Sequence, residues 1–207
     1  MPDHPRFESL EGLRGTGKST IAPMLAASRD AVLVPTMPPL YEPLRREMDT
    51  RANVDARMCF YLSALLTAVD QIRSHLIAGN PVVVESYFAR CFANHRAFGA
   101  GIDVELPAEV PQPTTYYLVC AENERRRRLA HRNKPVSRWD VLAEDAAEQI
   151  TRAYAQFPMH RVDTTGLTPG EVCRTILATD MQGAHRRANA EPVGTHPYLL
   201  PSVPCRS

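Results

Sequence analysis

The sequence predicts an α/β protein with three layers, in which helices flank a five-stranded parallel sheet. Three observations favour this fold. Short apolar runs alternate with helical patterns along most of the 207 residues. A glycine-rich loop joins the first apolar run to the first helical pattern. The run Val82-Val83-Val84 is continuously β-branched, which is typical of a strand buried on both faces.

The expected elements alternate between strand and helix along the chain, as parallel sheets with helical crossovers require. Strands are expected over residues 6–11, 31–35, 82–84, 114–120 and 160–163. Helices are expected over residues 19–28, 43–48, 54–78, 86–98, 122–132 and 139–157, with a last helix from Pro169 through Leu177.

Glycine and proline mark the boundaries in the first half of the chain. The strand over residues 6–11 runs directly into the glycine-rich loop, and the apolar run over 31–35 is followed by a proline-rich turn. The segment 54–78 has apolar residues at helical spacing. It ends at Gly79-Asn80-Pro81, where glycine and then proline stop a helix.

The second half of the chain repeats the alternation. Residues 114–120 are rich in β-branched and aromatic side chains, which favour a strand. The charged helix that follows is broken at Asn133-Lys134-Pro135, and residues 139–157 again show helical spacing of apolar side chains. Pro169 suits the first turn of the final helix.

The loop over residues 12–20 fits the pattern G-x-x-x-x-G-K-S/T, with Gly12 and Gly17 as the fixed glycines. Glycines let successive N–H groups point at a triphosphate, and the helix that follows adds its positive N-terminal end. Lys18 can reach the β- and γ-phosphates, and the Ser19 hydroxyl can ligate Mg²⁺. The residues predicted to bind the nucleotide are Gly12, Arg14, Gly15, Thr16, Gly17, Lys18, Ser19 and Thr20.

Glu85 directly follows the buried valine strand. Ligands of open α/β sheets bind beyond the carboxyl ends of the strands, so this carboxylate is expected near the triphosphate. It can hold Mg²⁺ together with Ser19, or accept the proton of an attacking hydroxyl. A solvated carboxylate at a strand end is the alternative.

Arginines are concentrated between residues 125 and 138. Arg125, Arg128 and Arg132 share one face of the expected helix through i+3 and i+4 spacing. Phosphoryl transfer needs cations around the equatorial oxygens, which the guanidinium fork suits. A solvated helix with neighbouring glutamates as ion-pair partners is the alternative.

Residues 11–20 resemble the opening of thymidylate kinases and related nucleoside kinases, and residues 78–87 resemble that family's third strand. The likeness extends in order over about residues 6–180. The resemblance implies the P-loop NTPase fold, ATP as phosphoryl donor, Mg²⁺ and a lid at about residues 125–140. It implies that three basic residues of this lid close over the transferring phosphoryl group, namely Arg128, Arg132 and Arg138.

The acceptor side departs from this family. Residues 35–39 lack the family's Arg-Glu-Pro-Gly phrase, residues 61–66 hold no basic residue, and Ser86 stands where the family's Asp-Arg-Tyr has its arginine. A desolvated phosphate without cationic partners is costly, which disfavours an acceptor monophosphate. The sequence therefore predicts transfer to a hydroxyl of a non-phosphorylated small molecule, either a nucleoside or an amino sugar or similar natural product. The predicted acceptor-binding residues are Thr36, Tyr61, Tyr87, Arg90 and His95.

Two alternatives remain open. The first is a nucleoside monophosphate kinase whose phosphate clamp uses other arginines, such as Arg45, Arg51, Arg57, Arg90 or Arg96. The second is a nucleotide-dependent regulatory switch. Residues 163–166 match D-x-x-G and residues 133–134 begin N-K-x-D, but Val136 replaces the aspartate and the order is reversed for a GTPase.

Composition and charge limit the classes of partner and the location that we expect. The net charge of +1 gives no field for nucleic acid or membrane binding, and five widely spaced cysteines without a C-x-x-C pair disfavour a zinc site. No segment looks like a signal peptide or a membrane span, so we expect a cytoplasmic protein. The domain is expected over residues 1–182, followed by an extended or disordered tail over 183–207. The helix over 54–78 is apolar enough to serve also as a homodimer face.

Overall fold

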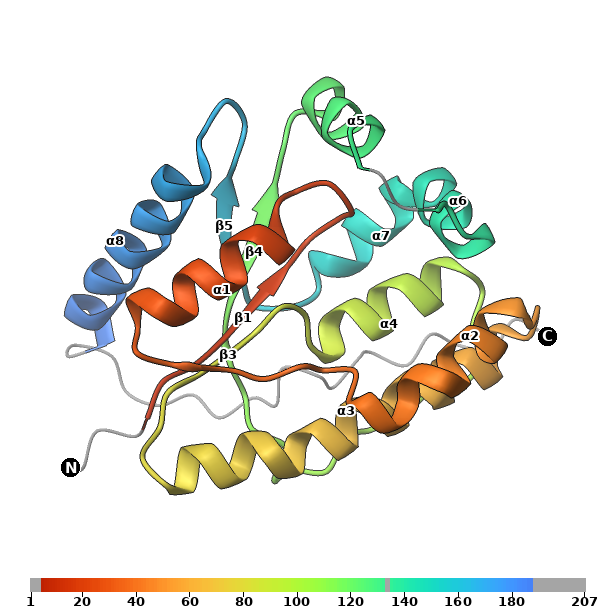
Figure 1. Ribbon diagram of the computed structural model, residues 1–207, viewed down its shortest axis with the longest axis horizontal. Coiled ribbons are helices and arrows are strands. Elements are labelled where there is room, and N and C mark those ends of the chain that lie inside the picture. Colours follow the sequence, from red (N-terminus) through yellow and green to blue (C-terminus); the bar gives the residue numbers. More distant parts are fainter. Residues whose placement is uncertain (1–4, 133–134, 188–207) are drawn as a thin grey trace.

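The computed structural model describes residues 5–132 and 135–187, and its centre is a parallel sheet (Figure 1). The five-stranded sheet predicted from the sequence is confirmed, and all of its neighbouring strands are parallel. Across the sheet the strands are ordered β2 (Val32–Leu33), β3 (Val82–Val84), β1 (Phe7–Glu11), β4 (Thr114–Val119) and β5 (His160–Asp163).

Helices cover both faces of this sheet, so the three predicted layers are confirmed (Figure 1). Helices α1 (Lys18–Ser28) and α8 (Pro169–Arg187) pack on one face. Helices α3 (Val54–Ile77), α4 (Phe88–Ala97) and α7 (Ala147–Tyr154) pack on the other. The remaining helices are η1 (Pro39–Tyr41), α2 (Glu42–Thr50), α5 (Glu122–Ala130) and α6 (Arg138–Asp145).

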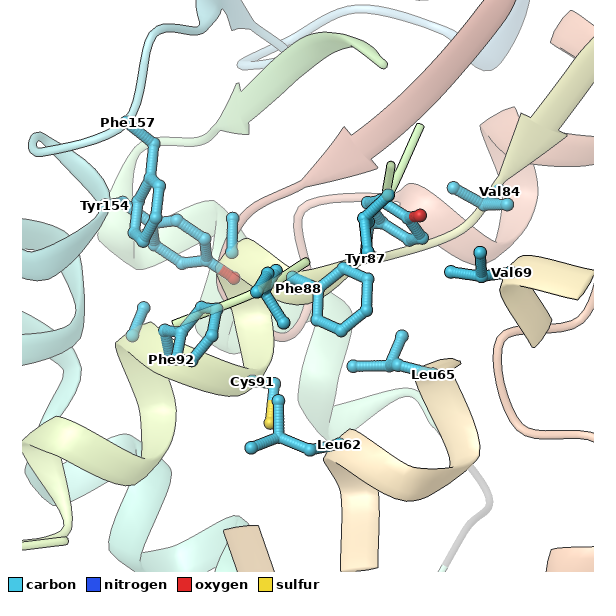
Figure 2. Packing of buried hydrophobic residues seen from close by; sticks show 14 of the residues in the cluster. Leu62, Leu65, Val69, Val84, Tyr87, Phe88, Cys91, Phe92, Tyr154 and Phe157 are labelled. Carbon is cyan, nitrogen blue, oxygen red and sulfur yellow. The ribbon is translucent and has the colours of Figure 1, made fainter. Parts of the chain in front are cut away.

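The larger core lies between the sheet and the layer of α3, α4 and α7 (Figure 2). Leu62 and Leu65 of α3 contribute to the same buried cluster as Phe88 and Phe92 of α4, and Tyr154 of α7 closes it. Each of these aromatic rings is at most 2 % exposed. Close packing against this cluster therefore fixes the positions of α3 and α4, which carry several of the polar groups described below.

Two of the expected helices differ from the sequence prediction by more than a few residues. The single helix expected over residues 139–157 is two helices, α6 and α7, separated by Ala146 with φ −95° and ψ 13°. Because of this break, α7 packs on α4, and the axis of α6 is not a continuation of the axis of α7. The last helix continues to Arg187, into the segment expected to be an extended tail, and the rest of that tail lies outside the described residues.

Among the described helices, none is both long enough and apolar enough to cross a membrane. The four described cysteines, Cys59, Cys91, Cys120 and Cys173, carry free thiols. The fifth, Cys205, lies outside the described residues.

Candidate functional site

A cavity of about 860 Å³ opens where β1 and β3 end. Gly12 follows β1 and Glu85 follows β3, and both line the cavity. Further parts of the wall come from α1, α2, α3, α4, α6 and α7 and from the turn after β2. The position agrees with the rule that ligands of parallel α/β sheets bind beyond the carboxyl ends of the strands.

The glycine-rich loop has the backbone that its motif requires. Gly12 has a φ of +138°, and a Cβ there would lie 2.3 Å from the carbonyl oxygen of Leu118 in β4. Gly17 has a left-handed backbone conformation and forms the N-cap of α1. As a glycine it offers no side-chain hydrogen bond to the first amides of the helix. The N–H groups at the start of α1 therefore remain available for an anion, which the helix dipole also favours.

Lys18 is buried beneath this loop. Its Nζ donates hydrogen bonds to the carbonyl oxygens of Gly12 at 2.7 Å and Leu13 at 2.9 Å. Burial and the nearby charge of Arg90 together lower the pKa of Lys18 to about 7, although the carboxylate of Glu11 opposes the shift. A phosphate anion beside Nζ would favour the charged ammonium, so the site is electrostatically suited to a polyphosphate.

Ser19 and Glu85 meet at the mouth of the loop. The Ser19 hydroxyl donates a hydrogen bond of 2.7 Å to Oε1 of Glu85. A hydroxyl and a carboxylate are the hard oxygen donors that suit Mg²⁺, which usually takes only one or two protein side chains and completes its shell with phosphate and water. No larger group of three metal-ligating acids, histidines or cysteines occurs within the described part of the chain. The pair therefore fits Mg²⁺ bound to a nucleotide.

Glu11, the last residue of β1, is a buried carboxylate that the site prediction did not include. It accepts hydrogen bonds from the backbone N–H of Tyr87 at 2.7 Å and from the hydroxyl of Tyr154 at 3.3 Å. Burial raises its pKa to about 7, although the Tyr87 bond and the charge of Lys18 act in the opposite direction. Its place at a strand end directly before the first glycine of the loop was the available sequence signal.

Arg57 also lines the cavity, and the sequence indicates it only as one of five arginines that could clamp an acceptor phosphate. Its guanidinium donates to Oδ1 of Asp49 at 3.1 Å and to the hydroxyl of Tyr61 at 3.2 Å, and it lies 2.9 Å from Nε2 of His95. The rings of Tyr61 and Trp139 each lie 4.4 Å from its Cζ atom. This buried cation is therefore satisfied by its protein neighbours.

His95 is held in one neutral form by its neighbours. Its Nδ1 lies 2.7 Å from the carbonyl oxygen of Cys91, an acceptor, so Nδ1 carries the proton and Nε2 accepts from Arg57. Burial lowers the pKa of His95 to about 4, although the Cys91 bond opposes the shift. His95 is therefore uncharged at neutral pH and orients Arg57.

Two further arginines line the cavity. Arg45 lies 3.5 Å from Glu42 and 3.8 Å from Asp49, so carboxylates also accompany this cation. Arg90 instead reaches the hydroxyl of Ser86 at 3.5 Å, one helical turn away. Ser86 stands where the sequence resemblance to thymidylate kinases implies an arginine. Arg90 therefore brings a guanidinium close to this position from a different residue.

The three predicted lid arginines have different surroundings. Arg132 lines the cavity. Arg128 donates to the hydroxyl of Thr164 at 3.0 Å and to its carbonyl at 2.8 Å, which fixes α5 to the end of β5. Arg138 is exposed and lies 5.1 Å from the ring of Trp139. The structure thus brings one of the three to the cavity.

The cavity gathers most of the other predicted site residues. Those that line it are Gly12, Arg14, Ser19, Thr36, Tyr61, Glu85, Tyr87, Arg90, His95 and Arg132. The predicted residues outside its wall are Gly15, Thr16, Gly17, Lys18, Thr20, Arg128 and Arg138. Of these, the glycines and Lys18 shape the loop itself.

A glycine-rich loop between β1 and α1, on a parallel sheet of this order, defines a P-loop protein with the fold of small kinases. A model of the family described as AAA domain (AAA_18) matches residues 9–151, and the chain belongs to this family. Among curated proteins, none matches the sequence.

Two solved structures show the same fold. Thymidylate kinase from Candida albicans aligns with a TM-score of 0.70 at 15% identity, covering 87% of this chain and 93% of that one. A gluconokinase from Sinorhizobium meliloti 1021 aligns with a TM-score of 0.55 at 19% identity, covering 89% and 97%. The predicted thymidylate kinase-like fold is thereby confirmed.

Proposed function

We propose that the protein is an ATP-dependent phosphotransferase that moves the γ-phosphoryl group to a hydroxyl of a small, non-phosphorylated acceptor. A nucleoside, an amino sugar and a similar polyhydroxylated natural product are the acceptor classes. The kinase fold and the loop that can hold a triphosphate support the phosphotransferase class. Both structural relatives are kinases by name, and the gluconokinase is named for an acceptor that carries no phosphate.

The ion pairs of Arg45 and Arg57, on the side of the cavity that we assign to the acceptor, are the observation that favours a non-phosphorylated acceptor. Arg57 is bonded to Asp49, and Arg45 lies near both Asp49 and Glu42. An acceptor phosphate placed here would meet these carboxylates as well as the arginines, and would have to replace ion pairs that already exist. An uncharged acceptor would leave the pairs in place and avoids the cost of breaking a buried one.

The proposed roles follow from position. The loop amides and Lys18 would bind the β- and γ-phosphates, and Ser19 and Glu85 would hold Mg²⁺, which offsets phosphate charge when it is bound. Glu85 would also accept the proton of the attacking hydroxyl. Arg90 and Arg132, which line the same cavity, would balance charge on the transferring group.

A nucleoside monophosphate kinase is the second candidate. Three arginines that could grip an acceptor phosphate, Arg45, Arg57 and Arg90, do line the cavity. The structural relative from Candida albicans is a thymidylate kinase. This candidate requires Arg45 and Arg57 to exchange their carboxylate partners for the acceptor.

The test is ADP release from ATP and Mg²⁺ with a panel of nucleosides, nucleoside monophosphates, amino sugars and gluconate. We expect stimulation by one non-phosphorylated class and a fall in kcat of about 10²–10⁴-fold in Glu85→Gln, the usual contribution of a general base. Glu109→Gln, which changes an exposed glutamate, is the matched control. Stimulation by monophosphates alone would establish the second candidate. ATP binding with no acceptor would instead favour a nucleotide-dependent switch.

A further inference from the structure

The first turn of α6 lies between the nucleotide loop and the acceptor side. It begins with a capping box in which Ser137 and Asp140 exchange hydrogen bonds with each other's backbone N–H groups. Trp139 and Asp140 are adjacent, so their side chains leave the helix about 100° apart. Both residues line the cavity, and each contacts a different side of it.

Trp139 contacts the acceptor side. Its Nε1–H donates to the carbonyl oxygen of Asp49, near the end of α2, at 3.0 Å. Its ring lies 4.4 Å from the Cζ atom of Arg57 and 5.6 Å from the ring of Phe98, and it is 4 % exposed. Trp139 therefore restrains the guanidinium of Arg57 from one face.

Asp140 contacts the nucleotide loop. Its Oδ1 pairs with Nε of Arg14 at 3.0 Å, and Glu144, one turn further along α6, lies 3.7 Å from the same guanidinium. Arg125 strengthens this connection, because it donates to the carbonyl oxygen of Arg14 at 3.1 Å and pairs with Glu144 at 2.6 Å. Arg14 is thus held by α6 at a position inside the phosphate-binding loop.

We propose that Asp140 and Trp139 are positioning residues that couple the nucleotide loop to the acceptor side. A triphosphate in the loop attracts the Arg14 guanidinium and competes with Asp140 and Glu144 for it. A change in that pairing displaces the first turn of α6 as a unit. Trp139 then moves relative to Arg57, so the nucleotide sets the position of the acceptor-side cation. This inference rests on the nucleotide-binding half of the proposed function and is independent of the acceptor.

The chain contains a single tryptophan, and it is Trp139. Its fluorescence therefore reports on this turn of α6 without any label. The experiment titrates the full-length protein with ATP and Mg²⁺, without acceptor, while tryptophan emission is recorded and calorimetry measures binding in parallel. We expect the emission to change with the same half-saturation as the calorimetric Kd.

Asp140→Asn is the diagnostic variant, because the amide keeps an oxygen for the capping box and loses the charge that pairs with Arg14. We expect it to bind ATP within about fivefold of the wild type, as for a partly exposed ion pair, and to lose most of the emission change. Arg14→Lys, which keeps the positive charge and loses the guanidinium fork, should lose the emission change as well. Asp145→Asn, at an exposed position of the same helix, should respond like the wild type.

Two results would overturn the coupling. One is calorimetric ATP binding by the wild type with no change in Trp139 emission. The other is an unaltered emission change in both Asp140→Asn and Arg14→Lys. A failure to find any acceptor would contradict the proposed transfer reaction and leave this result standing, whereas a wild type that binds no ATP would refute both proposals.

Discussion

The hydroxyl of Tyr87 provides a test in which the sign of the effect is decisive. Tyr87 is 1 % exposed, and no described residue offers its hydroxyl a hydrogen-bond partner. The ring lies among Phe88, Val84 and Val69 (Figure 2), and burial raises its pKa well above the usual value for tyrosine. An unsatisfied buried hydroxyl costs about 1–3 kcal/mol of folding free energy.

Tyr87→Phe removes this unsatisfied group and keeps the ring. We therefore expect the free energy of unfolding to rise by about 2 kcal/mol. With a urea m-value of about 2 kcal/mol/M, the urea midpoint should increase by about 1 M. If the hydroxyl bonds the acceptor, as its predicted role implies, the same variant should raise the acceptor KM about tenfold, the equivalent of one lost hydrogen bond, with little change in the KM for ATP.

Tyr116→Phe is the matched control for stability. The Tyr116 hydroxyl is also buried, but it donates to the carboxylate of Glu8 at 3.1 Å. Its removal should lower the free energy of unfolding by about 1.5–3 kcal/mol, as for a bond to a charged group. Two tyrosine-to-phenylalanine changes should thus move the urea midpoint in opposite directions. A fall in the midpoint of Tyr87→Phe would show that its hydroxyl has a favourable partner and would refute the reasoning.

Two further predictions concern the loop and the buried histidine. Gly12→Ala should lower the free energy of unfolding by more than about 3 kcal/mol and abolish ATP binding, because its Cβ would lie 2.3 Å from the Leu118 oxygen. Gly79→Ala, also at positive φ but with no atom within 4 Å, should cost only about 1–2 kcal/mol in the same urea titration. The pKa of His95 is lowered to about 4, so between this pH and about 6.5 the unfolded chain binds more protons than the folded one. The free energy of unfolding should therefore fall as the pH drops through this window, by up to about 1.4 kcal/mol per unit. Urea titrations of His95→Gln should lack this component, and an identical slope in both proteins would contradict the assignment.

The features that follow from strand order could be predicted from the sequence. Ser19 and Glu85 are 66 positions apart in the chain, yet the sequence predicts that they lie together, and a 2.7 Å hydrogen bond joins them in the structure. The reason is geometric. Parallel strands end at the same edge of a sheet, and β1 and β3 are direct neighbours. The glycine-rich loop after β1 and the carboxylate of Glu85 after β3 therefore lie side by side.

The features that depend on the reach of long side chains could not be predicted. The sequence shows no basic residue over 61–66 and offers Arg57 only as one of five possible clamps for an acceptor phosphate, without a pattern that singles it out. In the structure the guanidinium comes from this residue, one turn earlier on the same helix. Its orientation depends on Asp49 from α2 and Trp139 from α6, which no local pattern connects. Arg128 presents the converse case. Its spacing places it on the face of Arg132, but Thr164 at the end of β5 binds its guanidinium instead.

The distribution of paired and unpaired cations bears on the reaction itself. On the acceptor side, Arg45 and Arg57 have carboxylate neighbours within ion-pair distance. Within the described part of the chain, no carboxylate lies within that distance of Arg90 or Arg132, and both act electrostatically on Lys18. The two arginines without a carboxylate at ion-pair distance therefore lie next to the glycine-rich loop, where the proposed transfer would develop negative charge. With the non-phosphorylated acceptor that we propose, this charge is available to the transferred phosphoryl group alone, whereas a phosphorylated acceptor would compete with that group for Arg90.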